Sequence, residues 1–302
     1  MPFLQGRSRT VALPAPWPRA SARAGDVLAL AKPGLNLLVV ATTAAGYYLG
    51  AARVDAATLA ATAIGTALVA AGAAAFNEVL ERESDALMRR TRMRPVAAGR
   101  MGAAQAGWFA AAQTGGGLAT LAVGANFLAA GVAAFALLSY VLVYTPLKRR
   151  TPLSTVVGGI PGGLPPMIGW AAATGTLSAG GWILFAIVLL WQMPHFLAIA
   201  WGCRGDYARA GLPLLPVVEP DGRSTGRQAV LYASALLPVS LAPTLIGLAG
   251  RLYFGAALVL GAAFLALAVQ FASRRTAGSA RRLFAGSVAY LPLLWALMLL
   301  DH

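Results

Sequence analysis

Nine stretches of about twenty mostly apolar residues constrain the fold of this chain more than any other feature of its sequence. A helix needs about 20 such residues to cross the hydrocarbon core of a bilayer. The stretches are continuously apolar, whereas the strands of a membrane barrel alternate in polarity over about ten residues. We therefore expect an all-α polytopic transmembrane bundle. The expected spans are residues 34–52, 57–80, 104–123, 127–146, 153–173, 181–202, 229–248, 252–272 and 283–300.

The composition supports lipid as the solvent of this bundle. Of the 302 residues, 58% are apolar and only 11% are charged, which leaves too little polar surface to cover a soluble globule. Residues 1–31 are rich in Arg, Ala and Pro and lack the apolar core of a secretory signal. We expect residues 1–31 to form a cytoplasmic N-terminal tail and residues 32–302 to form a single transmembrane domain.

The positions of the basic residues predict the orientation in the membrane. With the N-terminus in the cytoplasm, 22 of the 24 Lys and Arg residues lie on that side, and only Arg53 and Arg251 lie outside. Basic residues near span ends are retained in the cytoplasm, which predicts this orientation. We expect a multi-pass protein of the bacterial inner membrane, with its C-terminus in the periplasm. The net charge of +14 is then explained by topology and by attraction to membrane lipid, so no nucleic-acid partner is expected.

The densest charge in the chain follows the second expected span, in residues 77–95. If the helix continues, Asn77, Glu81 and Asp85 stand at i, i+4 and i+8 and share one face. One amide and two carboxylates on such a face suit a Mg²⁺ ion that takes further ligands from water and from a substrate phosphate. We therefore expect these three residues to be catalytic residues and metal ligands.

A cluster of arginines follows this polar face directly, and it would suit a diphosphate leaving group. The alternative is that the arginines only obey the positive-inside rule and that the acids pair with them. Acids contribute little to topology, yet this segment holds four of the ten acids in the chain, which favours a functional role. The arginines expected to bind diphosphate are Arg89, Arg92 and Arg94.

Three further features each have two interpretations. Tyr144 and Lys148 stand at i and i+4 at a span end, where they could contact one phosphate or act as an interfacial anchor. His195 follows Pro194 within a span, where it could be a ligand or serve as a packing residue. The Gly158–Gly169 stretch contains three prolines and cannot be a regular helix throughout; it could line a cavity or form a close helix crossing.

These motifs carry a family resemblance. The pattern Asn77-x-x-x-Glu81-x-x-x-Asp85, with Arg-Thr-Arg-x-Arg-Pro ending at Pro95, resembles the first aspartate-rich motif of the UbiA-type intramembrane prenyltransferases. Further segments resemble the haem-modifying members of this family, and the similarity runs from Lys32 to the ninth expected span. These segments are Tyr144 to Leu153, Gly159 to Trp170, Trp191 to Phe196, and Asp206 to Pro213.

The resemblance implies a bundle with a lateral cavity in which farnesyl diphosphate prenylates a vinyl group of haem B. The products would be haem O, a precursor of haem A, and diphosphate. Haem A synthase, the next enzyme to act on haem O, is the candidate protein partner. The resemblance adds Asp206 to the catalytic residues, Tyr144, Lys148 and Arg149 to the diphosphate site, and His195 to the haem site. The chain departs from the family pattern in having Glu81 where Asp is common and in lacking the first acid of the second motif.

Two alternatives differ in function. A secondary transporter would also have broken helices and buried acids, but it would place its ionisable groups near the middle of the bilayer. Here the charged motifs gather at the cytoplasmic ends of the second, fourth and sixth expected spans, which favours a single active-site mouth. The other alternative is a prenyltransferase with a different acceptor, a quinone precursor or chlorophyllide.

Overall fold

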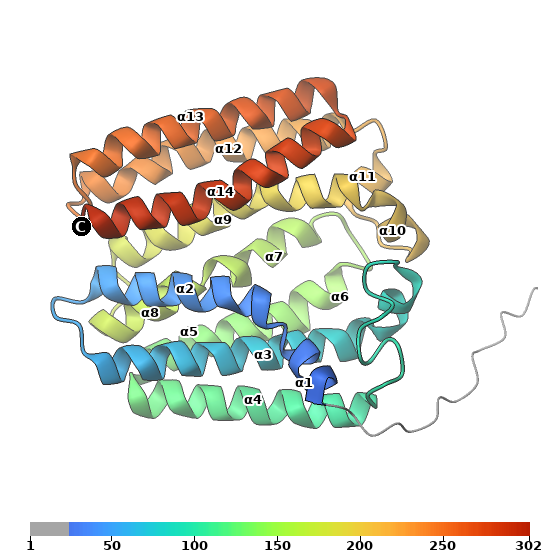
Figure 1. Cartoon of the computed structure of the whole chain (residues 1–302), viewed down its shortest axis with the longest axis horizontal. Helices are drawn as coiled ribbons and strands as arrows, with labels where there is room; N and C mark the ends of the chain where they lie inside the picture. The colour runs from blue at the N-terminus through green and yellow to red at the C-terminus, as the bar shows by residue number, and fades with distance from the viewer. Residues whose placement is uncertain (1–23) are drawn as a thin grey trace, which may run out of the picture.

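The structure is a computed structural model that describes residues 24–302, and all regular elements within this range are helices. The long helices run side by side along one direction, and the connecting segments gather at the two ends (Figure 1). This arrangement confirms the expected all-α bundle. The elements are α1 (Ala24–Ala31), α2 (Pro33–Gly50), α3 (Ala56–Leu87), α4 (Ala103–Gly124), α5 (Phe127–Leu138), the π-helix η1 (Ser139–Tyr144), α6 (Thr145–Leu147), α7 (Ser154–Gly163), α8 (Pro165–Thr174), α9 (Ala179–Gly202), α10 (Arg204–Arg209), α11 (Leu215–Val218), α12 (Arg223–Leu245), α13 (Arg251–Arg274) and α14 (Ala277–Leu300).

The expected number of nine spans is not confirmed. Six helical segments of the described chain are long and apolar enough to cross a membrane, and the pair α1 and α2, bent by 43°, would make a seventh. The expected span 104–123 coincides with helix α4, but Gln105, Gln113 and several glycines lower its apolar character. The expected span 153–173 is divided between α7 and α8, each of ten residues.

The division between α7 and α8 follows from the prolines of this segment. Pro165 lacks the N–H that would continue the helical hydrogen bonds, and it begins α8 one residue after α7 ends. Helix α8 then crosses α2 at very close range: a Cβ atom added to Gly46 would collide with the backbone of Pro166, and one added to Gly169 with that of Thr43. This half of the segment is therefore a close crossing of small residues.

The helices pack around two main apolar cores. One core joins α9 with α12, α13 and α14, and the other joins α3, α4 and α5 with α8. Figure 1 shows these groups as two stacked sets of helices, with α7 between them. The segments that follow α3, α6 and α9 lie at the same end of the bundle, as expected from the charge pattern. The C-terminus lies at the other end.

The N-terminal segment is helical where it is described. Residues 24–31, which the sequence placed in a tail, form α1; Leu30 is fully buried, and Arg100 Nε lies 2.7 Å from Asp26 Oδ1. The rest of the expected tail, residues 1–23, lies outside the described residues.

Candidate active site

The predicted polar face forms as expected because α3 continues without a break to Leu87. Asn77, Glu81 and Asp85 are all buried on the inward face of this helix, and Glu78 is buried beside them. Acids are rarely buried in a bundle unless they are paired or serve a function. The site is therefore built around the last three turns of α3.

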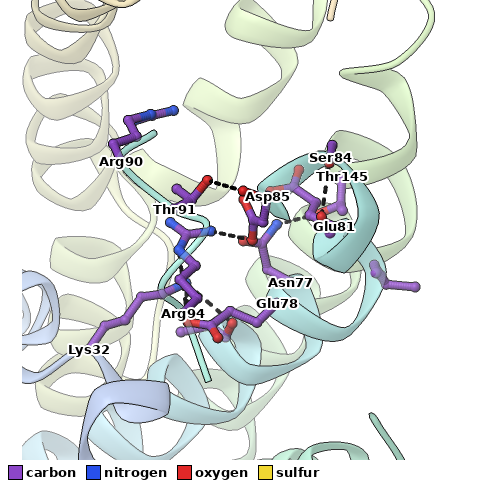
Figure 2. Close-up of polar contacts among 12 residues, drawn as sticks. Lys32, Asn77, Glu78, Glu81, Ser84, Asp85, Arg90, Thr91, Arg94 and Thr145 are labelled. Atoms are coloured by element: carbon purple, nitrogen blue, oxygen red, sulfur yellow. Dashed lines mark hydrogen bonds and ion pairs between the residues drawn. The ribbon is translucent and has the colours of Figure 1, made fainter. Parts of the chain in front are cut away.

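The segment after α3 folds back over this face and brings arginine to it (Figure 2). Arg94 Nη1 lies 2.7 Å from Asp85 Oδ2, and Arg94 Nε lies 4.0 Å from Glu78 Oε1. The Thr91 hydroxyl donates to the Asp85 carbonyl at 2.9 Å, which fixes the turn. The guanidinium group of Arg94 thus places a positive charge between two buried carboxylates.

A second cation, Lys32, reaches one of these carboxylates, Glu78, from the junction of α1 and α2. Its Nζ lies 3.5 Å from Glu78 Oε1 and donates to the Ala74 carbonyl at 3.5 Å. The backbone of Lys32 is left-handed, with φ of 48°, a conformation that costs energy for a non-glycine residue and that often occurs at functional sites. Lys32 and Glu78 are not among the predicted site residues, although Lys32 is one of only two lysines in the chain.

The third cation is Lys148, which follows α6 and lies against α3. Its Nζ lies 2.8 Å from Glu81 Oε1 and 4.5 Å from the centroid of the Tyr144 ring. Burial alone would lower the pKa of Lys148, but Tyr144 and Glu81 raise it above its ordinary value, so the ammonium group stays charged. A second polar contact also joins α6 to α3: Asn77 Nδ2 donates to Thr145 Oγ1 at 3.3 Å.

The remaining predicted residues lie at the edge of this cluster. Asp206, on α10, accepts from the backbone N–H of Arg89 at 3.4 Å and pairs with Arg209, so the second motif contacts the segment after α3. Arg149 donates to the Leu80 carbonyl at 3.2 Å. The side chains of Arg89 and Arg92 are exposed, and the structure does not bring them to the buried carboxylates.

An apolar cavity of about 370 Å³ begins beside these charges and extends into the bundle. Its α3 wall continues the polar face, because Ala73 and Ala74 stand one turn before Asn77 and Glu78. The π-helix η1 contributes both Tyr140 and Tyr144 to the wall; π-helical turns are frequent at functional sites. The other lining residues are Leu35, Asn36, Leu38, Val39, Thr42, Thr66, Val69, Ala70, Ala133, Ala136, Leu137, Gly158, Pro161, Gly162, Pro165, Ile168, Val188, Trp191, Gln192, His195, Phe196 and Leu291.

Two features left open by the sequence are found in this wall. Gly158, Pro161, Gly162 and Pro165 line the cavity, so the proline-rich segment forms both a cavity wall and the crossing with α2. His195 also lines the cavity, within an α9 helix that continues through Pro194.

The buried oxygens of α3 can accept a metal ion of the kind predicted. Asp85 Oδ1 and Glu78 Oε2 are buried and have no hydrogen-bond partner within residues 24–302. Asn77 uses its amide nitrogen on Thr145, so its amide oxygen remains an acceptor. The described residues contain no group of three or more His, Cys, Asp or Glu that would form a complete metal cage. A few protein oxygens that leave ligand positions for water and phosphate suit Mg²⁺.

The sequence of this chain matches a family of known proteins. Residues 39–297 match the UbiA prenyltransferase family. A protein of Solibacter usitatus named protoheme IX farnesyltransferase is 49% identical, over 92% of this chain and 98% of the relative. A protein of the same name from Koribacter versatilis is 43% identical, over 98% of this chain and 99% of the relative.

Solved structures share the fold at low sequence identity. A digeranylgeranylglyceryl phosphate synthase has a TM-score of 0.78 at 17% identity, covering 92% of this chain and 97% of that one. A UbiA homologue from Archaeoglobus fulgidus, bound to GPP and Mg²⁺, has a TM-score of 0.65 at 18% identity, covering 90% and 99%.

Proposed function

Because this chain belongs to the UbiA prenyltransferase family, we propose that it transfers the farnesyl group of farnesyl diphosphate to a vinyl group of haem B. The products are haem O and diphosphate. The observation that carries this proposal is the name protoheme IX farnesyltransferase, borne by relatives that are 49% and 43% identical and that match over 98% and 99% of their own lengths. The chain is thus a polytopic membrane enzyme, and a transporter is no longer an alternative.

Diphosphate binds, in this proposal, at the cations around α3. Lys32, Arg94 and Lys148 approach the same helix face from three separate parts of the chain. Breaking the allylic carbon–oxygen bond leaves the electron pair on diphosphate, and fixed cations stabilise that charge without having to reorganise. Arg149 and Tyr144 complete the phosphate side of the site, and Arg89 and Arg92 are exposed cations near its mouth.

Mg²⁺ is the cofactor we assign to this site, held by Asn77, Glu81 and Asp85. When bound, it neutralises the charge that develops on the leaving diphosphate. Glu81 and Asp85 each also contact one cation, which orients these carboxylates. A UbiA homologue of known structure that binds GPP together with Mg²⁺ supports the use of a divalent ion.

The cavity holds the hydrocarbon parts of the substrates. Its volume of about 370 Å³ lies within the range of small-molecule sites, and its wall is mostly Ala, Leu, Val and aromatic side chains. Such a wall excludes water while the farnesyl carbocation exists, so that the haem vinyl group can attack it first. One water then adds to the resulting cation and loses a proton, which gives the hydroxyethylfarnesyl group of haem O.

Two assignments concern the ends of this site. His195 is placed on the haem side, since it lines the cavity away from the charged cluster. Asp206 is placed at the mouth, where it organises the segment that carries Arg89.

We assign the protein to the bacterial inner membrane with a cytoplasmic N-terminus. Haem A synthase is the partner expected to take up its product.

The pigment made in cells tests the acceptor. In a bacterium that lacks its own enzyme, expression of this chain should produce a haem that elutes later than haem B on reversed phase. An Asp85→Asn variant expressed to the same level is the control and should yield haem B only. If wild-type cells contain only haem B together with a newly prenylated quinone precursor or chlorophyllide, the acceptor is wrong.

A further inference from the structure

A chain of hydrogen bonds behind the cavity ends on His195. The Ser287 hydroxyl lies 2.6 Å from the Phe284 carbonyl, to which it donates, and 2.7 Å from His195 Nδ1. Ser287 is fully buried on α14, while His195 is half-buried on α9 and lines the cavity. The histidine therefore depends on a side chain from a different helix.

This geometry favours one nitrogen of His195 as the carrier of the proton. A serine hydroxyl has one hydrogen, and here that hydrogen is used on the Phe284 carbonyl. With that hydrogen on the Phe284 carbonyl, the Ser287 oxygen accepts from His195, and Nδ1 is the protonated nitrogen of the neutral ring. Nε2 is left with its lone pair. Within residues 24–302, Nε2 has no hydrogen-bond partner.

The plane of the imidazole is fixed as well. The ring is stacked on Trp191 with centroids 5.0 Å apart and on Phe284 with centroids 5.1 Å apart. Trp191 is itself held by a hydrogen bond of 2.8 Å from its Nε1 to the Ser287 carbonyl. Contacts with two aromatic rings and one hydrogen bond leave the imidazole little freedom to rotate.

We propose that Ser287 is a positioning residue that presents the Nε2 lone pair of His195 to the iron of the haem substrate. The inference rests on the proposed function, because it assumes that the acceptor is a haem. An imidazole that served only for packing would need partners for both nitrogens in so apolar a wall. A histidine that ligates a metal typically donates its other N–H to a partner that sets the tautomer, and Ser287 supplies that partner.

Ligation of the iron would also hold the porphyrin in one register. A bond from His195 to the iron fixes the centre of the porphyrin. The vinyl groups then lie at a fixed distance from the iron. Orientation of this kind is worth a large rate factor when two substrates must meet. Without the bond to iron, contact with the cavity wall alone would leave the flat porphyrin free to slide.

Titration of the purified full-length protein in detergent separates this role from packing. The probes are haem and metal-free protoporphyrin IX, followed by absorption spectra and by Kd. Ser287→Ala should weaken haem binding about 10- to 100-fold and shift the Soret band, since removing the partner of a ligating histidine has effects of this size. His195→Ala should remove the preference for haem over protoporphyrin. Both variants should bind protoporphyrin as the wild type does.

Two controls guard against a general structural effect. Ser240→Ala removes another fully buried serine whose hydroxyl donates to a carbonyl three residues earlier, but Ser240 does not line the cavity. It should leave the haem spectrum unchanged. Ser287→Thr keeps the hydroxyl and should restore the spectrum; if the extra methyl prevents folding, Ser287→Cys should give a haem affinity between those of serine and alanine.

The inference fails if Ser287→Ala and His195→Ala leave the Soret band of bound haem unchanged, even when activity is lost. Equal losses of haem and protoporphyrin binding would also overturn it, because the iron would then play no part. A wild-type protein that binds neither porphyrin would instead refute the proposed function, and this inference with it.

Discussion

Lys148 offers the sharpest test of the diphosphate site, because its side chain has both a structural partner and a proposed substrate. Lys148→Met keeps most of the length and apolar stem but removes the ammonium group. If that group binds diphosphate, the loss of one charge-assisted contact costs about 1.5 to 3 kcal/mol, or roughly 10- to 150-fold in Kd for farnesyl diphosphate. Haem titration should be unchanged, since the cation lies at Glu81 and not beside His195.

The same substitution leaves the buried Glu81 carboxylate without its cation. The two groups are 2.8 Å apart with side chains only 19% and 10% exposed, so the unpaired carboxylate should cost on the order of 1 to 3 kcal/mol of stability. The double variant Lys148→Met with Glu81→Gln removes both charges and should recover the thermal stability measured in detergent. It should not recover binding of farnesyl diphosphate.

Arg150→Met is the matched control, because Arg150 is an exposed neighbour that belongs to no proposed contact. It should leave both the Kd and the thermal midpoint near those of the wild type. Our reasoning is refuted if Lys148→Met lowers stability while the Kd for farnesyl diphosphate stays within about threefold of the wild-type value, because the ion pair would then be structural only.

Two further predictions concern the metal and the topology. Asp85→Ala and Glu81→Ala should each abolish turnover while the protein stays folded in detergent, and removal of Mg²⁺ by a chelator should do the same to the wild type; activity that survives chelation would contradict the metal assignment. Reporters fused after Arg94 or Arg150 should report a cytoplasmic location and one fused after Asp301 a periplasmic one, whereas a cytoplasmic C-terminus would contradict an odd number of spans.

The parts of this protein that depend on local geometry could be predicted from the sequence. The polar face of Asn77, Glu81 and Asp85 follows from helical periodicity alone, so it needed no knowledge of neighbouring helices. The gathering of charged segments at one end followed from the alternation of spans. The count of nine spans is not confirmed, because the segment before Pro165 and the segment after it form two short helices, and because the apolar character of α4 is diluted by polar residues and glycines.

The contacts that complete the site were decided only by the tertiary structure. Lys32 meets Glu78 from 46 positions away in the numbering, and Ser287 meets His195 from 92 positions away. Neither pair has a sequence signal beyond its residue types, since such contacts depend on which helices pack together and at what rotation. The sequence by itself determined that a charged helix end would face an apolar interior. Which cations reach that end, and which nitrogen of His195 faces the cavity, depended on how the helices pack.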